Sequence, residues 1–186
     1  MAVWQPLTPD DNEAVMRIAD VIHSELPEGA HVFAERVKLF PEGCLALVKQ
    51  EEHGSGGSGR RELCGYAISH PIRHRQPPVL DAALGAIAPD ASQYYIHDFC
   101  VLPAFRGQGL ADQGVQRLLS AAADTERFPD GACLVSVYNT KPFWARYGFV
   151  PPEPSSIDAA LVEKVSVYGE DARYLERRPP TSSSKS

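Results

Sequence analysis

The sequence has few positive charges, no long hydrophobic run and no cluster of cysteines, and each absence excludes a class of protein. Its 18 Lys and Arg residues are outnumbered by 24 Asp and Glu, the net charge is −6, and the basic residues form no long run. We therefore expect no nucleic-acid partner. No apolar segment approaches the roughly 20 residues that cross a bilayer, so we expect no membrane insertion. The first residues lack the basic and apolar segments of a signal peptide, and none is expected.

The four cysteines, Cys44, Cys64, Cys100 and Cys133, lie far apart in the sequence, three of them inside apolar runs. Disulfide frameworks and zinc sites use cysteines at closer or more regular spacing. The pattern fits reduced core thiols of a cytoplasmic protein, and we expect no metal site.

A chain of 186 residues is long enough for one domain that buries roughly 70% of its unfolded surface. We assign this domain to residues 1–178 and expect the polar tail 179–186 to be disordered. Segment 50–61 is rich in Gly and Ser and cannot pack. It separates two apolar runs at 44–48 and 63–68, which predicts a β-hairpin with a flexible tip.

Residues 71–93 form a proline-containing insertion loop, with a short helical turn expected at 81–87. A loop of this length is often a binding wall or a lid, and a plain irregular connection is the alternative. Near the C-terminus we predict two last strands, at 161–168 and 173–176.

Helix signals occur at three places outside the central motif. Thr8 followed by Pro9 and acidic residues is an N-cap that begins a first helix. A second helix is predicted over 31–40. A short third helix is predicted over 141–147, where Gly148 follows as a stop signal.

Residues 94–111 combine a strand, a turn and a helix start. An aromatic and β-branched run up to Val101 predicts a buried strand, and Pro103 ends it because proline lacks the N–H that a sheet needs. Arg106 and two glycines follow, and from Leu110 apolar residues recur at helical spacing. The turn thus leaves free N–H groups at the N-terminus of the helix, where the helix dipole is positive. Both features favour the binding of a phosphate group.

Two motifs carry a family resemblance. Residues 106–111 read Arg-Gly-Gln-Gly-Leu-Ala, and Asn139 precedes a Pro-Phe-Trp-Ala-Arg-Tyr-Gly-Phe segment at 142–149. These resemble the pyrophosphate signature and the second cofactor motif of the GNAT superfamily of N-acetyltransferases. The resemblance implies an α+β (mixed α/β) fold with a mostly antiparallel, twisted sheet of six to seven strands and about four flanking helices. The His-Asp-Phe-Cys-Val segment at 97–101 is most similar to the arylalkylamine (serotonin-type) branch.

The resemblance also implies an acetyl-CoA site. The pyrophosphate would bind the backbone of the turn and helix start, and the pantetheine arm would pair with the end of the strand. A bulge in that strand would turn the N–H of Val101 toward the thioester oxygen. The cofactor-binding residues implied are Phe99, Cys100, Val101, Arg106, Gly107, Gln108, Gly109, Leu110, Ala111, Asn139 and Trp144.

His97 is the candidate general base, because an imidazole with a pKa of about 6.5 suits proton transfer near neutral pH. In a regular strand it shares a face with Phe99, and Asp98 points to the opposite face. By resemblance His97 matches the branch's catalytic histidine. A hydrogen-bonded structural histidine is the alternative.

The general acid departs from the family pattern. The tyrosine that usually protonates the thiolate is replaced by Trp144, whose indole N–H only donates a hydrogen bond. Tyr147 is the candidate substitute, and Tyr138 and Tyr95 are further candidates. The thiolate can also leave unassisted, since thiols ionise near a pKa of about 8.5.

These motifs predict an acetyl-CoA-dependent N-acetyltransferase that acts on the primary amine of a small aryl- or alkylamine, by direct attack in a ternary complex. The acidic balance of the chain favours a cationic acceptor. A non-catalytic acyl-CoA-binding sensor or scaffold is one alternative, and an acetyltransferase for a protein amine is another. We expect a monomer or a homodimer.

Overall fold

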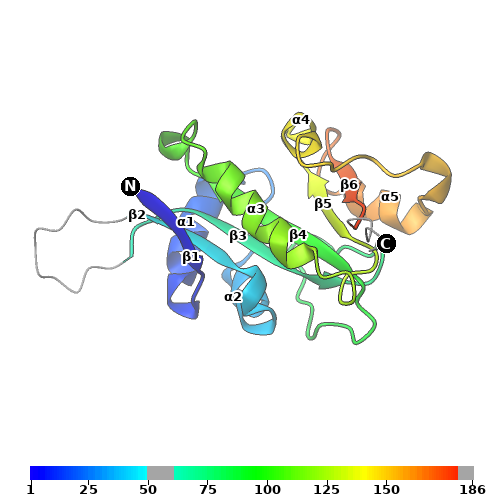
Figure 1. Ribbon diagram of the computed structural model, residues 1–186, viewed down its shortest axis with the longest axis horizontal. Helices are drawn as coiled ribbons and strands as arrows, with labels where there is room; N and C mark the ends of the chain where they lie inside the picture. Colours follow the sequence, from blue (N-terminus) through cyan, green and yellow to red (C-terminus); the bar gives the residue numbers. More distant parts are fainter. Residues whose placement is uncertain (50–60, 180–186) are drawn as a thin grey trace, which may run out of the picture.

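The computed structural model describes residues 1–49 and 61–179 (Figure 1). The strands are β1 (Ala2–Pro6), β2 (Leu45–Lys49), β3 (Leu63–Ile72), β4 (Gln93–Val101), β5 (Ala132–Ser136) and β6 (Arg173–Arg177). The helices are α1 (Asn12–Ile22), α2 (Ala30–Leu39), α3 (Leu110–Ala122), α4 (Lys141–Ala145) and α5 (Ala159–Ser166). Short 3₁₀ turns, each opened by a proline, are η1 (Pro9–Asp11), η2 (Pro41–Gly43), η3 (Pro103–Phe105) and η4 (Pro154–Ser156).

The strands form one six-stranded sheet in the order β1-β2-β3-β4-β5-β6. All neighbours are antiparallel except β4 and β5, which run parallel. This sheet and its flanking helices confirm the predicted α+β fold. β2 and β3 pair as the predicted hairpin, whose proposed flexible tip at 50–60 lies outside the described residues, as does the tail 180–186.

The parallel pair β4/β5 is short, and this determines where the sheet opens. The two strands pair only from Tyr94 to Ile96, opposite Ala132 to Leu134. β4 then continues to Val101 beside β3, while β5 stays with β6. The sheet therefore divides between β4 and β5 beyond Ile96.

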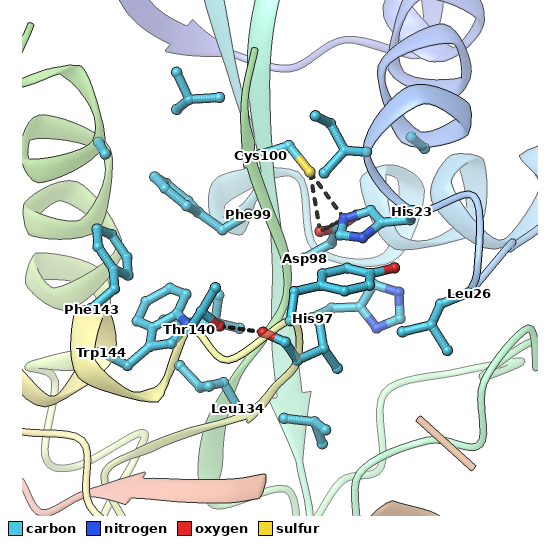
Figure 2. A pocket seen from close by; sticks show the side chains of 18 of the residues that line it. His23, Leu26, His97, Asp98, Phe99, Cys100, Leu134, Thr140, Phe143 and Trp144 are labelled. Atoms are coloured by element: carbon cyan, nitrogen blue, oxygen red, sulfur yellow. Dashed lines mark hydrogen bonds and ion pairs between the residues drawn. The ribbon is translucent and has the colours of Figure 1, made fainter. Parts of the chain in front are cut away.

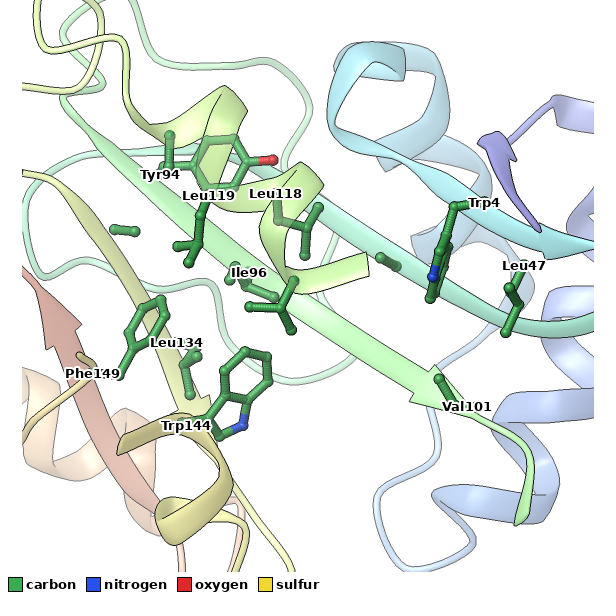
Figure 3. Close-up of a cluster of buried hydrophobic side chains, with 14 of the residues drawn as sticks. Trp4, Leu47, Tyr94, Ile96, Val101, Leu118, Leu119, Leu134, Trp144 and Phe149 are labelled. Atoms are coloured by element: carbon green, nitrogen blue, oxygen red, sulfur yellow. The ribbon is translucent and has the colours of Figure 1, made fainter. Parts of the chain in front are cut away.

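Helices cover both faces of the sheet. The helix α3 lies across one face, and α1 and α2 lie against the other (Figure 1). On the α3 face Trp4, Ile96, Leu118 and Phe149 belong to one large hydrophobic cluster, into which α4 inserts Trp144 (Figure 3). Apolar residues of α1 and α2 fill the opposite side, because each helix carries an apolar stripe.

A bulge in β4 changes which residues share a face. The β3–β4 register shifts between Ile68, opposite Asp98, and Ser69, opposite Ile96, which leaves His97 as an extra residue. Alternation is interrupted there, so His97 and Asp98 both point to the α1/α2 side. The expectation that His97 shares a face with Phe99 is therefore wrong: Phe99 packs toward α3.

The predicted strand at 161–168 is wrong, because residues 161–166 belong to α5 and a turn follows. The carboxylate of Asp158 accepts a hydrogen bond from the N–H of Leu161 at 2.8 Å and caps the helix. Leu161 is buried, whereas Val162 and Val167 are more than half exposed. The buried side of α5 carries Leu161, with Val165 packed beside it, and Val162 lies on the solvent side. The last strand, predicted at 173–176, is confirmed as β6.

The insertion begins later than predicted, since β3 continues through Pro71 to Ile72 and β4 starts at Gln93. The helical turn expected at 81–87 is also wrong, because the described loop 73–92 contains no helix. Side chains of α2 satisfy its backbone instead. The carboxylate of Glu35 accepts the N–H groups of residues 84 and 85 at 2.7 and 2.8 Å, and the buried Arg36 donates to a loop carbonyl at 2.7 Å.

No helix in residues 1–49 and 61–179 combines the length and the apolar character needed to cross a membrane.

Close packing of β3 on β4 gives a stability prediction. A Cβ added at Gly65 would clash with the carbonyl oxygen of Cys100, a backbone atom that cannot rotate away. We expect Gly65→Ala to lower the free energy of unfolding by about 1–3 kcal/mol, measured by chemical denaturation. In the control Gly85→Ala the new Cβ meets nothing within 4 Å at φ +72°, so the expected loss is only about 1 kcal/mol. Equal stability of Gly65→Ala and the unaltered protein would contradict this packing.

Candidate active site

A cavity of about 910 Å³ lies where β4 and β5 separate, within the size range of small-molecule sites. One wall carries Phe99 of β4 with Phe143 and Trp144 of α4 (Figure 2). The other wall carries His97 and Asp98 of β4 with His23 and Leu26, which follow α1 (Figure 2). β4 therefore runs between an aromatic half and a polar half of one cavity.

The free edge of β4 faces this cavity. The N–H of Leu102 donates to the carbonyl of Cys64 in the neighbouring strand at 2.8 Å. Because N–H directions alternate along a strand, the N–H groups of Phe99 and Val101 point away from β3. β5 does not pair with this part of β4. The resemblance implied a bulge that turns the N–H of Val101, but the bulge of β4 lies at His97. The N–H of Val101 faces the cavity because directions alternate along the strand and because β5 no longer pairs there.

The turn before α3 forms the second backbone surface of the cavity. Gly107 and Gly109 have φ of +74° and +73°, a conformation that favours glycine, and a Cβ at either would meet nothing within 4 Å. Gly109 is the N-cap of α3, so the first N–H groups of the helix are free of helical partners. The Nε of Arg106 donates to the carbonyl of Val101 at 3.0 Å, which holds this side chain at the cavity. The arrangement fits a diphosphate.

Of the remaining predicted cofactor residues, some line the cavity and others do not. Ala111 lines the cavity, whereas Leu110 is buried in the core and Gln108 is exposed. Trp144 lines the cavity at 6% exposure, its ring centroid 5.9 Å from that of Phe99.

Asn139 does not line the cavity. It is exposed at φ +56°, and its N–H donates to the carboxylate of Asp171 at 2.8 Å. Its neighbours Tyr138 and Thr140 are the lining residues.

His97 is paired with a carboxylate that the sequence analysis did not identify. Its Nε2 lies 2.9 Å from an Oε of Glu28, and the two side chains are 2% and 9% exposed. The other Oε of Glu28 accepts the N–H of Asp81 at 3.0 Å, while the Asp81 carboxylate accepts the N–H of Gly29 at 2.7 Å. The loop 73–92 thus holds Glu28 against His97. Burial raises the pKa of Glu28, but the neighbouring His97 outweighs it and holds the pKa below its usual value.

A third histidine lies beneath this pair. The ring centroids of His70 and His97 are 5.7 Å apart. Burial, together with the charge of His97, lowers the pKa of His70 to about 3, so His70 stays neutral. The Nδ1 of His97 and the Nε2 of His70 are both buried, and neither has a hydrogen-bond partner within residues 1–49 and 61–179.

A second polar cluster joins the end of α1 to β4. The Nε2 of His23 lies 2.9 Å from Oδ1 of Asp98 and 3.0 Å from Sγ of Cys100. Burial raises the pKa of Asp98, but the His23 ring outweighs it and the net pKa is lowered. Burial lowers the pKa of His23, and the Asp98 carboxylate reverses this to a net increase. Burial, followed by the charge of Asp98, raises the pKa of the Cys100 thiol.

The structure does not bring Tyr147 to His97. Its hydroxyl donates to the carboxylate of Asp112 on α3, and its side chain lies outside the cavity lining. Burial and this bond raise the pKa of Tyr147 to about 12. Tyr138 and Tyr95, the further candidates, both line the cavity.

Glu28 and His23 are site residues that no sequence pattern marks. Glu28 is one of 24 acidic residues and lies in a Pro-Glu-Gly turn whose pattern indicates only a helix end. His23 lies 75 positions from Asp98. No local pattern marks either residue, because each acquires its partner through the packing of α1 against the sheet.

A family model and solved structures of known proteins match this chain. The model of the acetyltransferase (GNAT) family matches residues 12–149. Among curated proteins compared by sequence, none matches.

Solved structures share the fold at low identity. The NatC complex bound to Gag peptide and CoA matches with a TM-score of 0.66 and 14% identity, over 95% of this chain and 98% of that chain. Arabidopsis thaliana NAA60 with a bisubstrate analogue matches with a TM-score of 0.63 and 15% identity, over 94% of this chain and 96% of that chain. Ard1 from Thermoplasma volcanium matches with a TM-score of 0.59 and 18% identity, over 96% of this chain and 97% of that chain.

The family model covers more than half of the 186 residues, and it includes the glycine turn and every residue that lines the cavity except Tyr168. The chain therefore belongs to the acetyltransferase (GNAT) family and is an acyltransferase.

Proposed function

We propose that the protein transfers an acetyl group from acetyl-CoA to the primary amine of a small, cationic aryl- or alkylamine. The observation that carries this proposal is the buried His97–Glu28 pair, which lies in the same cavity as the free edge of β4. A proton acceptor and a backbone N–H donor thus face one space. Family membership favours this enzyme over a non-catalytic acyl-CoA sensor.

The donor half of the cavity suits coenzyme A. The free N–H groups at the start of α3, with Arg106 beside them, would hold the pyrophosphate. The edge of β4 would pair with the amides of the pantetheine arm, and Trp144 would pack against it. Bound acetyl-CoA supplies the activated thioester. NAA60 and the NatC complex, which share this fold, were solved with acetyl-CoA and with CoA.

The acceptor half would activate the amine. An ammonium group must lose a proton before it attacks, and the His97–Glu28 pair would take it, with Glu28 fixed by Asp81. The N–H of Val101 would stabilise the negative charge that develops on the thioester oxygen. The amine nitrogen forms a C–N bond to the thioester carbon, the C–S bond then breaks, and CoA leaves as a thiolate without help from Tyr147, since a thiol ionises near a pKa of about 8.5.

The acceptor wall favours a cation with an aromatic or alkyl body. Glu28 and Asp98 are its inner acids, and both have lowered pKa values, so they stay ionised. An ammonium group is attracted both to these carboxylates and to aromatic faces. The aromatic residues of this wall are Phe33, Tyr95, Tyr138 and Tyr168. A peptide amine is the second candidate, because the NatC structure holds a peptide.

We further propose that the protein acts in the cytoplasm. Cys44, Cys64, Cys100 and Cys133 are all buried free thiols, the form that a reducing compartment maintains.

Gly109→Glu tests the diphosphate site. The new carboxylate would repel a pyrophosphate from the helix start, so we expect the Kd for CoA to rise at least about a hundredfold, measured by calorimetry. Gln116→Glu adds the same charge to an exposed position of the same helix and should bind CoA normally. Unchanged affinity of the Gly109 variant would rule out this site for the pyrophosphate.

Glu28→Gln tests the proton acceptor. We expect kcat to fall about a hundredfold, with the KM for acetyl-CoA unchanged, because the amide keeps the size and loses the charge that supports His97. Glu25→Gln alters an exposed acid of the same α1–α2 segment and should change kcat by less than about threefold. Similar kcat losses in both variants would argue against a specific role for Glu28.

A panel of acceptors tests the substrate class. Thiol release from acetyl-CoA would be followed with arylalkylamines, alkyl diamines and peptides with free N-termini or lysines. We expect the highest kcat/KM for a small amine. Turnover confined to peptides would replace the small-amine proposal by the peptide one, without affecting the CoA site.

A further inference from the structure

Three side chains of different chemistry converge on one point of the cavity. They are His23 at the end of α1 and Asp98 and Cys100, which point to the same face of β4 (Figure 2). The Nε2 of His23 is 2.9 Å from Oδ1 of Asp98 and 3.0 Å from Sγ of Cys100, and Sγ lies 3.5 Å from the same Oδ1. All three residues line the cavity.

The separations are close to those of metal ligands. A tetrahedral zinc ion with Zn–N and Zn–O bonds of about 2.1 Å and a Zn–S bond of about 2.3 Å keeps its ligand atoms about 3.5 Å apart. The Sγ–Oδ1 distance already meets this value. The two contacts of His23, at 2.9 and 3.0 Å, would have to lengthen by about 0.5 Å when the ion binds.

Hydrogen bonds hold the cluster together when no ion is bound. The Nε2 of His23 lies within hydrogen-bond distance of Asp98 Oδ1 and Cys100 Sγ, and the thiol of Cys100 donates to the same Oδ1 at 3.5 Å. A divalent cation would take the place of the shared protons and accept a lone pair from each of the three atoms.

The surroundings orient two of the three ligand side chains, Asp98 and His23. The hydroxyl of Tyr66 donates to the other carboxylate oxygen of Asp98, which leaves Oδ1 directed at His23. The ring of Tyr138 stacks on that of His23, with centroids 5.6 Å apart and planes 18° from parallel. Such outer partners orient ligands in metal sites.

We propose that His23, Asp98 and Cys100 form a site for a zinc-type divalent cation. Nitrogen, oxygen and sulfur ligands together suit zinc, and three protein ligands leave a fourth position that opens to the cavity. Binding releases the thiol proton of Cys100, and any proton on the Nε2 of His23, to solvent. Because Cys100 lies between Phe99 and Val101, the bound ion stands beside the acetyl-transfer site and inhibits the reaction. Only this inhibition rests on the proposed function, and the metal binding does not.

Cobalt titration of the full-length protein, first stripped of metal with a chelator, tests the site. We expect one Co²⁺ per chain with a tetrahedral visible spectrum and a thiolate-to-cobalt charge-transfer band in the near ultraviolet. One equivalent of Zn²⁺ should abolish both signals. Under the same conditions Zn²⁺ should inhibit acetyl transfer at the concentration at which it displaces cobalt.

Variants assign the ligands. Cys100→Ala should lose the charge-transfer band, and Cys44→Ala, which also removes a buried thiol, should keep it. Tyr66→Phe should keep the band and weaken binding about 10–100-fold. His23→Gln should weaken binding by more than Tyr66→Phe does, and it carries the test if Cys100→Ala does not fold.

Two results would overturn the proposal. One is the absence of a tetrahedral cobalt spectrum in the unaltered protein at a hundredfold excess of Co²⁺. The other is a spectrum and affinity that Cys100→Ala and His23→Gln leave unchanged, which would place the ion elsewhere. Zinc inhibition without stoichiometric cobalt binding would likewise count against the site.

Discussion

The separation of β4 from β5 beyond Ile96 is the constraint on which the rest of the site depends. Two parallel strands that stayed paired would satisfy each other's backbone groups and leave no room between them. Here the pairing stops after three residues on each strand, so the N–H groups of Phe99 and Val101 face a cavity rather than a neighbour. The glycine turn before α3 opens on the same cavity, and the backbone thus provides one continuous polar surface for a long ligand.

The bulge at His97 gives β4 its chemical asymmetry. One extra residue places two consecutive side chains on the α1/α2 side, where His97 meets Glu28 and Asp98 meets His23. Without it Asp98 would enter the hydrophobic cluster beneath α3, where an unpaired charge is costly. The bulge therefore serves stability and function together: it keeps the α3 side apolar and gathers the polar groups on the other.

The loop 73–92 supports the acceptor half of the site. Its amide at Asp81 fixes one oxygen of Glu28, while Glu35 and Arg36 of α2 hold the loop in place. These bonds cross more than 40 positions of sequence, and they order a segment that has no helix or strand of its own. Local periodicity contains no sign of these bonds, so the sequence left a binding wall and a plain connection as alternatives for this loop.

The sequence by itself determined the strand–turn–helix motif of residues 94–111, the family resemblance and most element boundaries, because hydrophobic period, proline and glycine act over a few residues. It failed at α5, where a short apolar segment is compatible with either a strand or a helix, and at His97, where the bulge depends on pairing with β3. Only the tertiary structure joined Glu28 to His97 and His23 to Asp98 and Cys100. Those contacts arise from the packing of α1 and its following loop against the sheet, which brings together side chains that the sequence separates by about 70 positions.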